Sequence, residues 1–216
     1  MENATLHYIH DPFCGWCYAA APLVKAAREV MPVRAHGGGM MAGARRRQVT
    51  PQLRAYVMPH DERIAQLTGQ PFGEAYFEGL LRDTAAVFDS TPPIAAVLAA
   101  DKLGGRGLDM LARLQTAHYV EGRRIAERDV LVAVAGEIGL DPARFAPALD
   151  DAQDDVGPHI EATRRLMAQH GIGGFPGFVL ERDGTFTPFD AAGFLGQPQA
   201  LRDWLASGCG PDGCSI

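Results

Sequence analysis

Segments with the character of β-strands occur only near the two ends of this 216-residue chain. Thr5–Ile9 is rich in β-forming residues and ends just before Asp11-Pro12, and Val33–His36 is a second candidate strand. The pattern returns at Gly177–Leu180 and, after an Asp-Gly turn, at Thr185–Phe189. Neither end can bury a sheet alone, so the two ends are predicted to form one sheet.

The segment between these ends, from about Met40 to His170, is predicted to be helical and shows no convincing strand. Within this segment, helices are expected to begin at Thr91-Pro92-Pro93, around Leu108, at Val130, at Asp141-Pro142 and at about Pro158, and the one from Val130 is expected to end at Gly139. Outside it, helices are expected from Gly15 to about Val30 and from Gln197 to Ala206. The expected class is α/β. Residues 1–39 and 171–216 are expected to form one thioredoxin-like domain, and residues 40–170 an all-helical insertion.

Charge and hydropathy exclude several functions. The net charge of -6 argues against nucleic acid or an anionic membrane as a partner, and Arg45-Arg46-Arg47 fits a solvated face. No stretch approaches the roughly 20 apolar residues of a membrane span. The first residues lack the basic and apolar segments of a signal peptide, so a cytoplasmic location is expected.

The four cysteines form two close pairs, Cys14/Cys17 and Cys209/Cys214. A chain of this length does not need disulfides to fold, so this distribution indicates chemistry. Two cysteines three residues apart at a helix start lie about one turn apart, which permits a reversible disulfide. The helix start favours a thiolate at Cys14, the predicted nucleophile, and places Cys17 further inside as the resolving thiol.

Two alternatives concern the same cysteines. C-x-x-C is also half of a zinc site, and a zinc-binding or redox-sensor module would combine Cys14, Cys17, Cys209 and Cys214. We favour the reading without a metal, because here the pair follows a strand and opens a long helix. Cys209 and Cys214 are then a candidate second redox pair that exchanges with the first, or else an incidental disulfide of the tail.

Three further residues near Cys14 and Cys17 are predicted to affect the site or the helix that carries it. Strand alternation places His10 nearer to the cysteines than His7, where it would relay protons or stabilise the thiolate, or else be an ordinary histidine at a strand end. Trp16 is expected to be an exposed aromatic residue that contacts substrate. Pro22 removes a helical hydrogen bond, which predicts a kink in the first helix.

The chain resembles the DsbA-like branch of the thioredoxin superfamily, and most closely its cytoplasmic FrnE-like protein-disulfide isomerases. The motifs that carry this resemblance are Asp11-Pro12-Phe13-Cys14-Gly15-Trp16-Cys17-Tyr18, Pro22, Gly69-Gln70-Pro71-Phe72-Gly73, Phe88-Asp89-Ser90, Tyr119-Val120-Glu121-Gly122 and Gly174-Phe175-Pro176.

The resemblance implies a thioredoxin fold with a helical insertion. It also implies a cis Phe175-Pro176 bond facing the cysteines, with the Phe175 backbone available to an extended substrate. The expected activity is thiol–disulfide exchange with protein or small-molecule thiols and disulfides, without a cofactor. The direction of electron flow and the redox partner stay open. A glutathione-dependent isomerase of the same fold is disfavoured, because such relatives usually carry serine at the position of Cys14.

Overall fold

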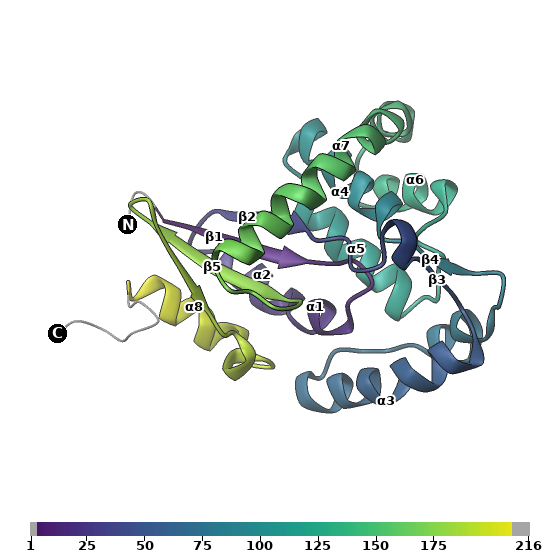
Figure 1. The fold of residues 1–216 in the computed structure, drawn as a ribbon, viewed down its shortest axis with the longest axis horizontal. Helices are drawn as coiled ribbons and strands as arrows, with labels where there is room; N and C mark the ends of the chain where they lie inside the picture. Colours follow the sequence, from purple (N-terminus) through teal and green to yellow (C-terminus); the bar gives the residue numbers. More distant parts are fainter. Residues whose placement is uncertain (1–3, 209–216) are drawn as a thin grey trace.

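A four-stranded sheet in the order β2-β1-β5-β6 forms the centre of the computed structural model, which describes residues 4–208 (Figure 1). The strands and α-helices are β1 (Ala4–His10), α1 (Gly15–Ala19), α2 (Ala21–Ala27), β2 (Val33–Gly37), β3 (Arg47–Gln48), α3 (Pro51–Thr68), β4 (Val87–Phe88), α4 (Thr91–Gly104), α5 (Gly107–Tyr119), α6 (Arg128–Glu137), α7 (Pro142–Gln169), β5 (Gly177–Arg182), β6 (Thr185–Phe189) and α8 (Pro198–Ala206). Short helical segments are η1 (Gly43–Arg45), η2 (Ala75–Gly79), η3 (Leu80–Arg82) and η4 (Ala192–Phe194).

The predicted pairing of the two chain ends is confirmed. Strand β1 runs parallel to β2, with Leu6 opposite Val33, and antiparallel to β5, with Leu6 also opposite Leu180. Strands β5 and β6 form the expected hairpin, in which Asp183 and Gly184 both have positive φ, as a tight Asp-Gly turn requires. The sheet therefore joins residues that lie more than 170 positions apart, as in Leu6 and Leu180.

Helices cover both faces of this sheet. Helices α2 and α8 pack against each other on one face, while α7 packs on β2 from the other, and α3 lies apart from the α4–α7 group (Figure 1). Tyr8 on β1 stacks on Phe178 of β5 at 5.2 Å between ring centroids. The fully buried Leu201 and Leu205 of α8 close the core on the side of α2. Among the described residues, no helix has both the length and the apolar character needed to cross a membrane.

The predicted kink at Pro22 is confirmed, and it breaks the expected helix into α1 and α2 at Ala20. Proline has no N–H, so Pro22 cannot donate to the carbonyl of Tyr18 one turn earlier. The side-chain amide of Gln70 donates to that Tyr18 carbonyl instead, at 2.8 Å. The break therefore leaves no unsatisfied carbonyl at this position, and it connects α1 to the segment that follows α3.

Three expectations for the middle of the chain were wrong in detail. The short pair β3 and β4 lies in the region predicted to have no strand. Helix α4 does begin at Thr91, but the capping position is Ser90 rather than Thr91. The two helices predicted from Asp141 and from Pro158 are one 28-residue helix, α7, with Pro147 and Pro158 inside it.

The continuity of α7 has a packing explanation. Its buried residues recur every three or four positions across both prolines and face α4; they are Phe145, Leu149, Ala152, Val156, Ile160 and Thr163. Such a stripe of buried side chains stabilises a helix more than two missing hydrogen bonds weaken it.

The division into residues 1–39 with 171–216 and an insertion of residues 40–170 stays a prediction.

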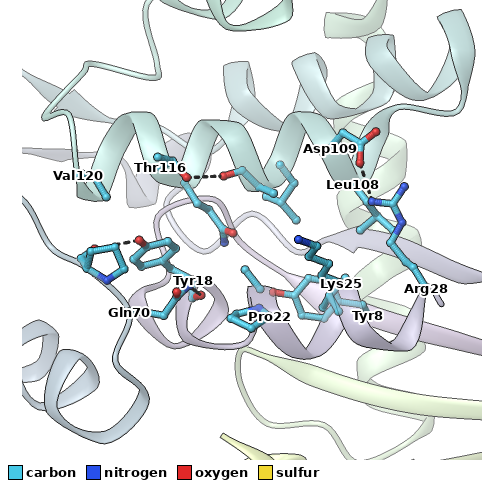
Figure 2. A pocket seen from close by; sticks show the side chains of 16 residues that line it. Tyr8, Tyr18, Pro22, Lys25, Arg28, Gln70, Leu108, Asp109, Thr116 and Val120 are labelled. Atoms are coloured by element: carbon cyan, nitrogen blue, oxygen red, sulfur yellow. Dashed lines mark hydrogen bonds and ion pairs between the residues drawn. The ribbon is translucent and has the colours of Figure 1, made fainter. Parts of the chain in front are cut away.

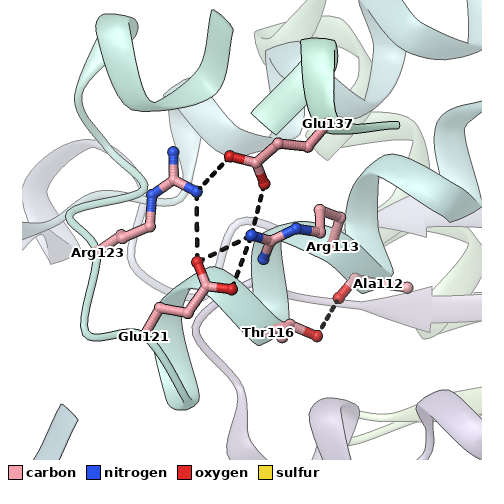
Figure 3. A network of polar contacts seen from close by, with 6 residues as sticks. All are labelled: Ala112, Arg113, Thr116, Glu121, Arg123 and Glu137. Carbon is pink, nitrogen blue, oxygen red and sulfur yellow. Dashed lines mark hydrogen bonds and ion pairs between the residues drawn. The ribbon is translucent and has the colours of Figure 1, made fainter. Parts of the chain in front are cut away.

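An ion-pair network fixes the turn after α5 (Figure 3). The Arg113 guanidinium binds the carboxylates of Glu121 at 2.7 Å and Glu137 at 2.5 Å, and Arg123 binds Glu137 at 2.8 Å. All four side chains are partly exposed, so each pair adds little stability by itself. Together they hold the segment after α5 against α6.

Candidate active site

Cys14 and Cys17 lie at the junction between β1 and α1, and both are free thiols. Cys14 is the N-terminal capping residue of α1, with extended backbone angles, and its Sγ accepts a hydrogen bond from the Cys17 N–H at 3.2 Å. Cys14 retains 6% exposure whereas Cys17 has none. The outer and inner positions predicted for the two cysteines are therefore observed.

The loop before β5 faces Cys14. The Phe175–Pro176 peptide bond is cis, and the Cys14 thiol donates to the carbonyl oxygen of Phe175 at 3.7 Å. Gly38 permits this approach, because a Cβ at that position would lie 2.2 Å from the Phe175 ring. The Gly38 N–H donates to the His10 carbonyl at 2.8 Å, which ties this glycine to the end of β1. The arrangement implied by the resemblance is confirmed in its geometry.

An apolar groove of about 400 Å³ opens beside this loop. Trp16 lines the groove and is partly buried, whereas the sequence predicted it to be exposed. The other walls come from α2, α3, the loop before β5, and the end of β6 with the segment that follows it; they include Leu67, Phe175, Pro176, Phe189 and Leu195. The groove therefore offers an apolar surface next to the outer thiol.

A second cavity, of about 580 Å³, lies on the other side of α1 and α2, between them and α5 (Figure 2). Tyr18 and Gln70 lie at one end of it, and the ion pair of Arg28 and Asp109, at 2.6 Å, lies at the other. Neither cysteine lines this cavity. Although it is larger, the chemistry of the site lies at the groove and not here.

One buried carboxylate that acts on Cys17, that of Asp11, was not predicted as a site residue from the sequence. The carboxylate of Asp11 is fully buried, and it accepts hydrogen bonds from the N–H groups of Phe13 at 3.0 Å and Met40 at 2.6 Å and from the Ser90 hydroxyl at 3.0 Å. Burial raises the pKa of Asp11 to about 6 despite these donors. Asp11 precedes Pro12 in the sequence, and this pattern indicated only a loop.

Burial is also the main influence on the inner thiol. It raises the pKa of Cys17 well above its ordinary value, and Cys14 and the charge of Asp11 raise it further. The backbone of Cys17 is fixed as well, since its carbonyl accepts from the Tyr8 hydroxyl at 3.0 Å. Cys17 is therefore a buried thiol whose ionisation is disfavoured and whose backbone is held by Tyr8.

His10 lies in the core at the end of β1, where its ring stacks on Tyr8 at 5.3 Å. Both of its ring nitrogens are buried without a partner, and burial lowers its pKa to about 3, with His159 and His36 contributing. Within residues 4–208, no hydrogen bond joins this ring to Cys14 or Cys17. Its role as a modulator stays a prediction.

The His10→Phe substitution is expected to reduce the sensitivity of the fold to acid. The pKa of His10 is lower in the folded than in the unfolded chain, so protons bind to the unfolded chain and stability falls as the pH drops below about 6.5. At pH 5 this group alone costs about 2 kcal/mol of unfolding free energy. Urea unfolding at pH 7 and pH 5 should therefore show a smaller difference in His10→Phe than in the wild type.

Substitution of the exposed His60 by asparagine provides the control, and the difference between the two pH values should stay at the wild-type level. An equally large acid effect in His10→Phe would contradict the expectation. The same variant also tests the proposed relay. A reduction rate that is unchanged at pH 7 would remove it.

A metal centre gains no support from the described residues. Between residues 4 and 208, no group of three or more histidine, cysteine, aspartate or glutamate side chains is arranged to hold a metal ion. Cys209 and Cys214, which the zinc alternative and the second redox pair both require, lie outside the described residues.

The site and the sheet together define the class of protein. A free C-x-x-C pair at the start of a helix after the first strand, with a cis-proline loop against its outer thiol, is the arrangement of a thiol–disulfide oxidoreductase of the thioredoxin fold. The family model for the DSBA-like thioredoxin domain matches residues 5–195, and the chain belongs to this family.

Solved structures agree with this assignment. The cytosolic disulfide reductase DsbM from Pseudomonas aeruginosa is 57% identical, with a TM-score of 0.90 over 94% of this chain and 98% of that one. The same protein with GSH gives 55% identity and a TM-score of 0.88 over the same shares of the two chains. A candidate protein disulfide isomerase from Nitrosomonas europaea is 26% identical, with a TM-score of 0.77 over 95% and 98% of the two chains. No curated protein matches the sequence.

Proposed function

We propose that this chain is a cytosolic disulfide reductase that uses Cys14 and Cys17 as its electron donors and a glutathione-type thiol as its source of electrons. The observation that carries the proposal is the position of Cys14, whose thiol lies 3.7 Å from the Phe175 carbonyl at the edge of an apolar groove, with Cys17 buried behind it. The similarity to a cytosolic disulfide reductase supports the reducing direction of electron flow and the cytosolic location. The solved structure of that reductase with GSH supports a glutathione-type thiol as the electron source.

The reaction has two exchange steps. The Cys14 thiolate attacks one sulfur of the substrate disulfide, forming a mixed disulfide and releasing the other sulfur as a thiolate. Cys17 then loses its proton and attacks the Cys14 sulfur, which releases the second substrate thiol and leaves a Cys14–Cys17 disulfide. The proton that Cys17 loses passes through solvent to the thiolate released in the first step, so charge and protons balance.

The enzyme returns to its starting state by the same chemistry in reverse. One glutathione thiolate attacks the Cys14–Cys17 disulfide and forms a mixed disulfide on Cys14. A second glutathione attacks that bond, which releases oxidised glutathione and restores both thiols. Two glutathione molecules thus supply the two electrons that each substrate disulfide consumes.

The substrate is proposed to lie across the cis-proline loop. The carbonyl oxygen of Phe175 faces Cys14, so an extended backbone can place a disulfide within reach of the thiol while it pairs with this loop. Trp16 and Pro176 line the adjoining groove and offer an apolar contact to the flanking side chain. A protein or small-molecule disulfide with an apolar neighbour fits this surface.

Replacement of Cys17 with serine should trap the first intermediate. Without the resolving thiol, Cys14 still attacks oxidised glutathione, and the mixed disulfide accumulates instead of being resolved within the enzyme. Intact-mass spectrometry after incubation with oxidised glutathione should show one glutathione per chain, mapped by peptide analysis to Cys14. The experiment is done with Cys209 and Cys214 also replaced by serine, so that no other cysteine of the chain can carry the label.

The matched control is Cys14→Ser in the same background, which retains only Cys17. Cys17 has no exposed surface and a raised pKa, so it should take up glutathione far more slowly. Equal labelling of the two variants, or labelling of neither, would contradict the assignment of Cys14 as the nucleophile.

A further inference from the structure

A carboxylate reaches the active-site loop from a helix distant in sequence. Asp61 is 4% exposed, and it is one of only two buried residues on α3, the other being Ile64. Burying a carboxylate is unfavourable unless a specific contact offsets the cost. The contact that α3 makes with α1 therefore includes a buried carboxylate as well as the apolar side chain of Ile64.

This carboxylate lies directly against Gly15, the residue that follows Cys14. A Cβ at Gly15 would lie 2.6 Å from Asp61 Oδ1 and 3.0 Å from Ile64 Cδ1, so a larger residue would force these α3 side chains to shift. The backbone of Gly15 does not have a positive φ, so the advantage of glycine here is one of space. The dipeptide between the two cysteines is thus shaped by the carboxylate of α3.

The two oxygens of Asp61 differ in their surroundings. Oδ2 accepts a hydrogen bond from the Tyr76 hydroxyl at 2.8 Å, which fixes the orientation of the carboxylate. Oδ1 is the atom that faces Gly15, and the described residues donate no hydrogen bond to it. The Tyr76 hydroxyl therefore orients the carboxylate through Oδ2, and Oδ1 is presented to α1.

The other titratable groups around Asp61 do not neutralise it. Tyr76 of η2 and Tyr119 of α5 are buried phenols, and burial raises the pKa of each well above its ordinary value. Tyr119 also lies within electrostatic reach of Cys14, Cys17 and Asp61. His60, on α3 itself, is exposed. It lowers the pKa of Asp61, but its effect is the smallest of the causes.

We propose that the Asp61 carboxylate, held against Gly15 by Tyr76, shifts the redox equilibrium of the Cys14–Cys17 pair toward the disulfide and so makes the reduced pair an electron donor. A negative charge disfavours a thiolate at Cys14 and leaves the uncharged disulfide unaffected. Disfavouring the reduced form makes the potential of the pair more negative. The inference rests on the proposed function of Cys14 and explains the direction of electron flow.

The Asp61→Asn substitution tests this charge, because asparagine keeps the shape and an acceptor for Tyr76. The equilibrium measured is reduced protein plus oxidised glutathione, giving oxidised protein plus two reduced glutathiones. At pH 7.5 the variant should favour its reduced form about tenfold more than the wild type, which equals a rise of about 30 mV in potential. The rate of Cys14 alkylation by iodoacetamide should rise several-fold.

The pH dependence separates a charge effect from a structural one. Burial raises the pKa of Asp61 to about 6, so the wild-type carboxyl is largely neutral at pH 5. The difference between wild type and Asp61→Asn should therefore vanish at pH 5, whereas a structural disturbance would persist at both pH values. Glu62→Gln is the matched control, since it removes one negative charge from an exposed neighbour on the same helix and should leave the equilibrium unchanged.

An equilibrium constant within twofold of the wild type at pH 7.5, with reductase activity intact, would overturn this inference and leave the proposed function standing. If Asp61→Asn does not fold, as judged by its thermal unfolding, Asp61→Ala and Asp61→Ser take its place and must shift the constant in the same direction. Failure of the proposed function itself would appear differently, as activity that survives loss of Cys14.

Discussion

The Cys14→Ser variant is expected to lose disulfide reduction, with kcat/KM falling at least about 10³-fold. Cys14 alone combines residual exposure, a position at the start of α1 and contact with the cis-proline loop. A serine hydroxyl does not ionise at neutral pH and cannot form the mixed disulfide. The measurement is glutathione-dependent reduction of insulin or hydroxyethyl disulfide, followed through NADPH consumption by glutathione reductase.

Loss of the fold is not expected to explain this result. Serine is a favourable N-terminal capping residue, and its hydroxyl can accept the Cys17 N–H hydrogen bond that Cys14 Sγ accepts in the wild type. The thermal midpoint of Cys14→Ser should therefore stay close to that of the wild type. Turnover within tenfold of the wild type would show that the electrons pass by another route.

The Gly73→Ala variant is expected to lose about 3 kcal/mol of unfolding free energy, at the upper end of the usual cost of overpacking. A Cβ at Gly73 would lie 1.9 Å from the carbonyl oxygen of Val120, which is backbone and cannot rotate away. The Gly73 N–H also donates to the Tyr119 carbonyl at 2.9 Å, so the two segments cannot separate without losing this bond. For a chain of this size the thermal midpoint should fall by roughly 6–12 °C.

Gly136→Ala is the matched comparison. Gly136 lies in α6, and an added Cβ would meet only Pro142 Cγ, at an ordinary contact distance of 3.4 Å. Alanine in a helix is favoured over glycine by up to about 1 kcal/mol, so this variant should be slightly more stable than the wild type. A Gly73→Ala protein as stable as Gly136→Ala would contradict the close contact with Val120.

Much of the fold could be predicted from the sequence, because short local patterns determine where strands, turns and helix breaks occur. Short β-forming runs bounded by Asp-Pro and Asp-Gly mark strands and turns, so the sheet and its hairpin were expected from Thr5–Ile9 and Gly177–Phe189. The break at Pro22 follows from the missing N–H of proline. By contrast, Pro147 and Pro158 do not interrupt α7, because packing on α4 outweighs their local effect.

The site could be predicted only in part, for a related reason. Cys14, Cys17 and Pro176 belong to short motifs, and their positions agree with the expected geometry. Asp61 has no such signal, since an acidic residue on a polar helix is ordinarily exposed. Asp11 stands at the start of the cysteine motif, but the motif does not indicate that its carboxylate is buried. Only the tertiary contacts of Asp61 with Gly15 and Tyr76 show that it is part of the active-site surroundings.

The hydrogen bond from Gln70 to the Tyr18 carbonyl also has an evolutionary consequence. That carbonyl needs an outside donor only because Pro22 cannot supply one, so the proline and the amide compensate for each other across 48 positions. Among homologues, the two sites are therefore expected to vary together. A sequence that lacks the proline no longer needs the amide, and one that keeps the proline should keep a side-chain donor at position 70.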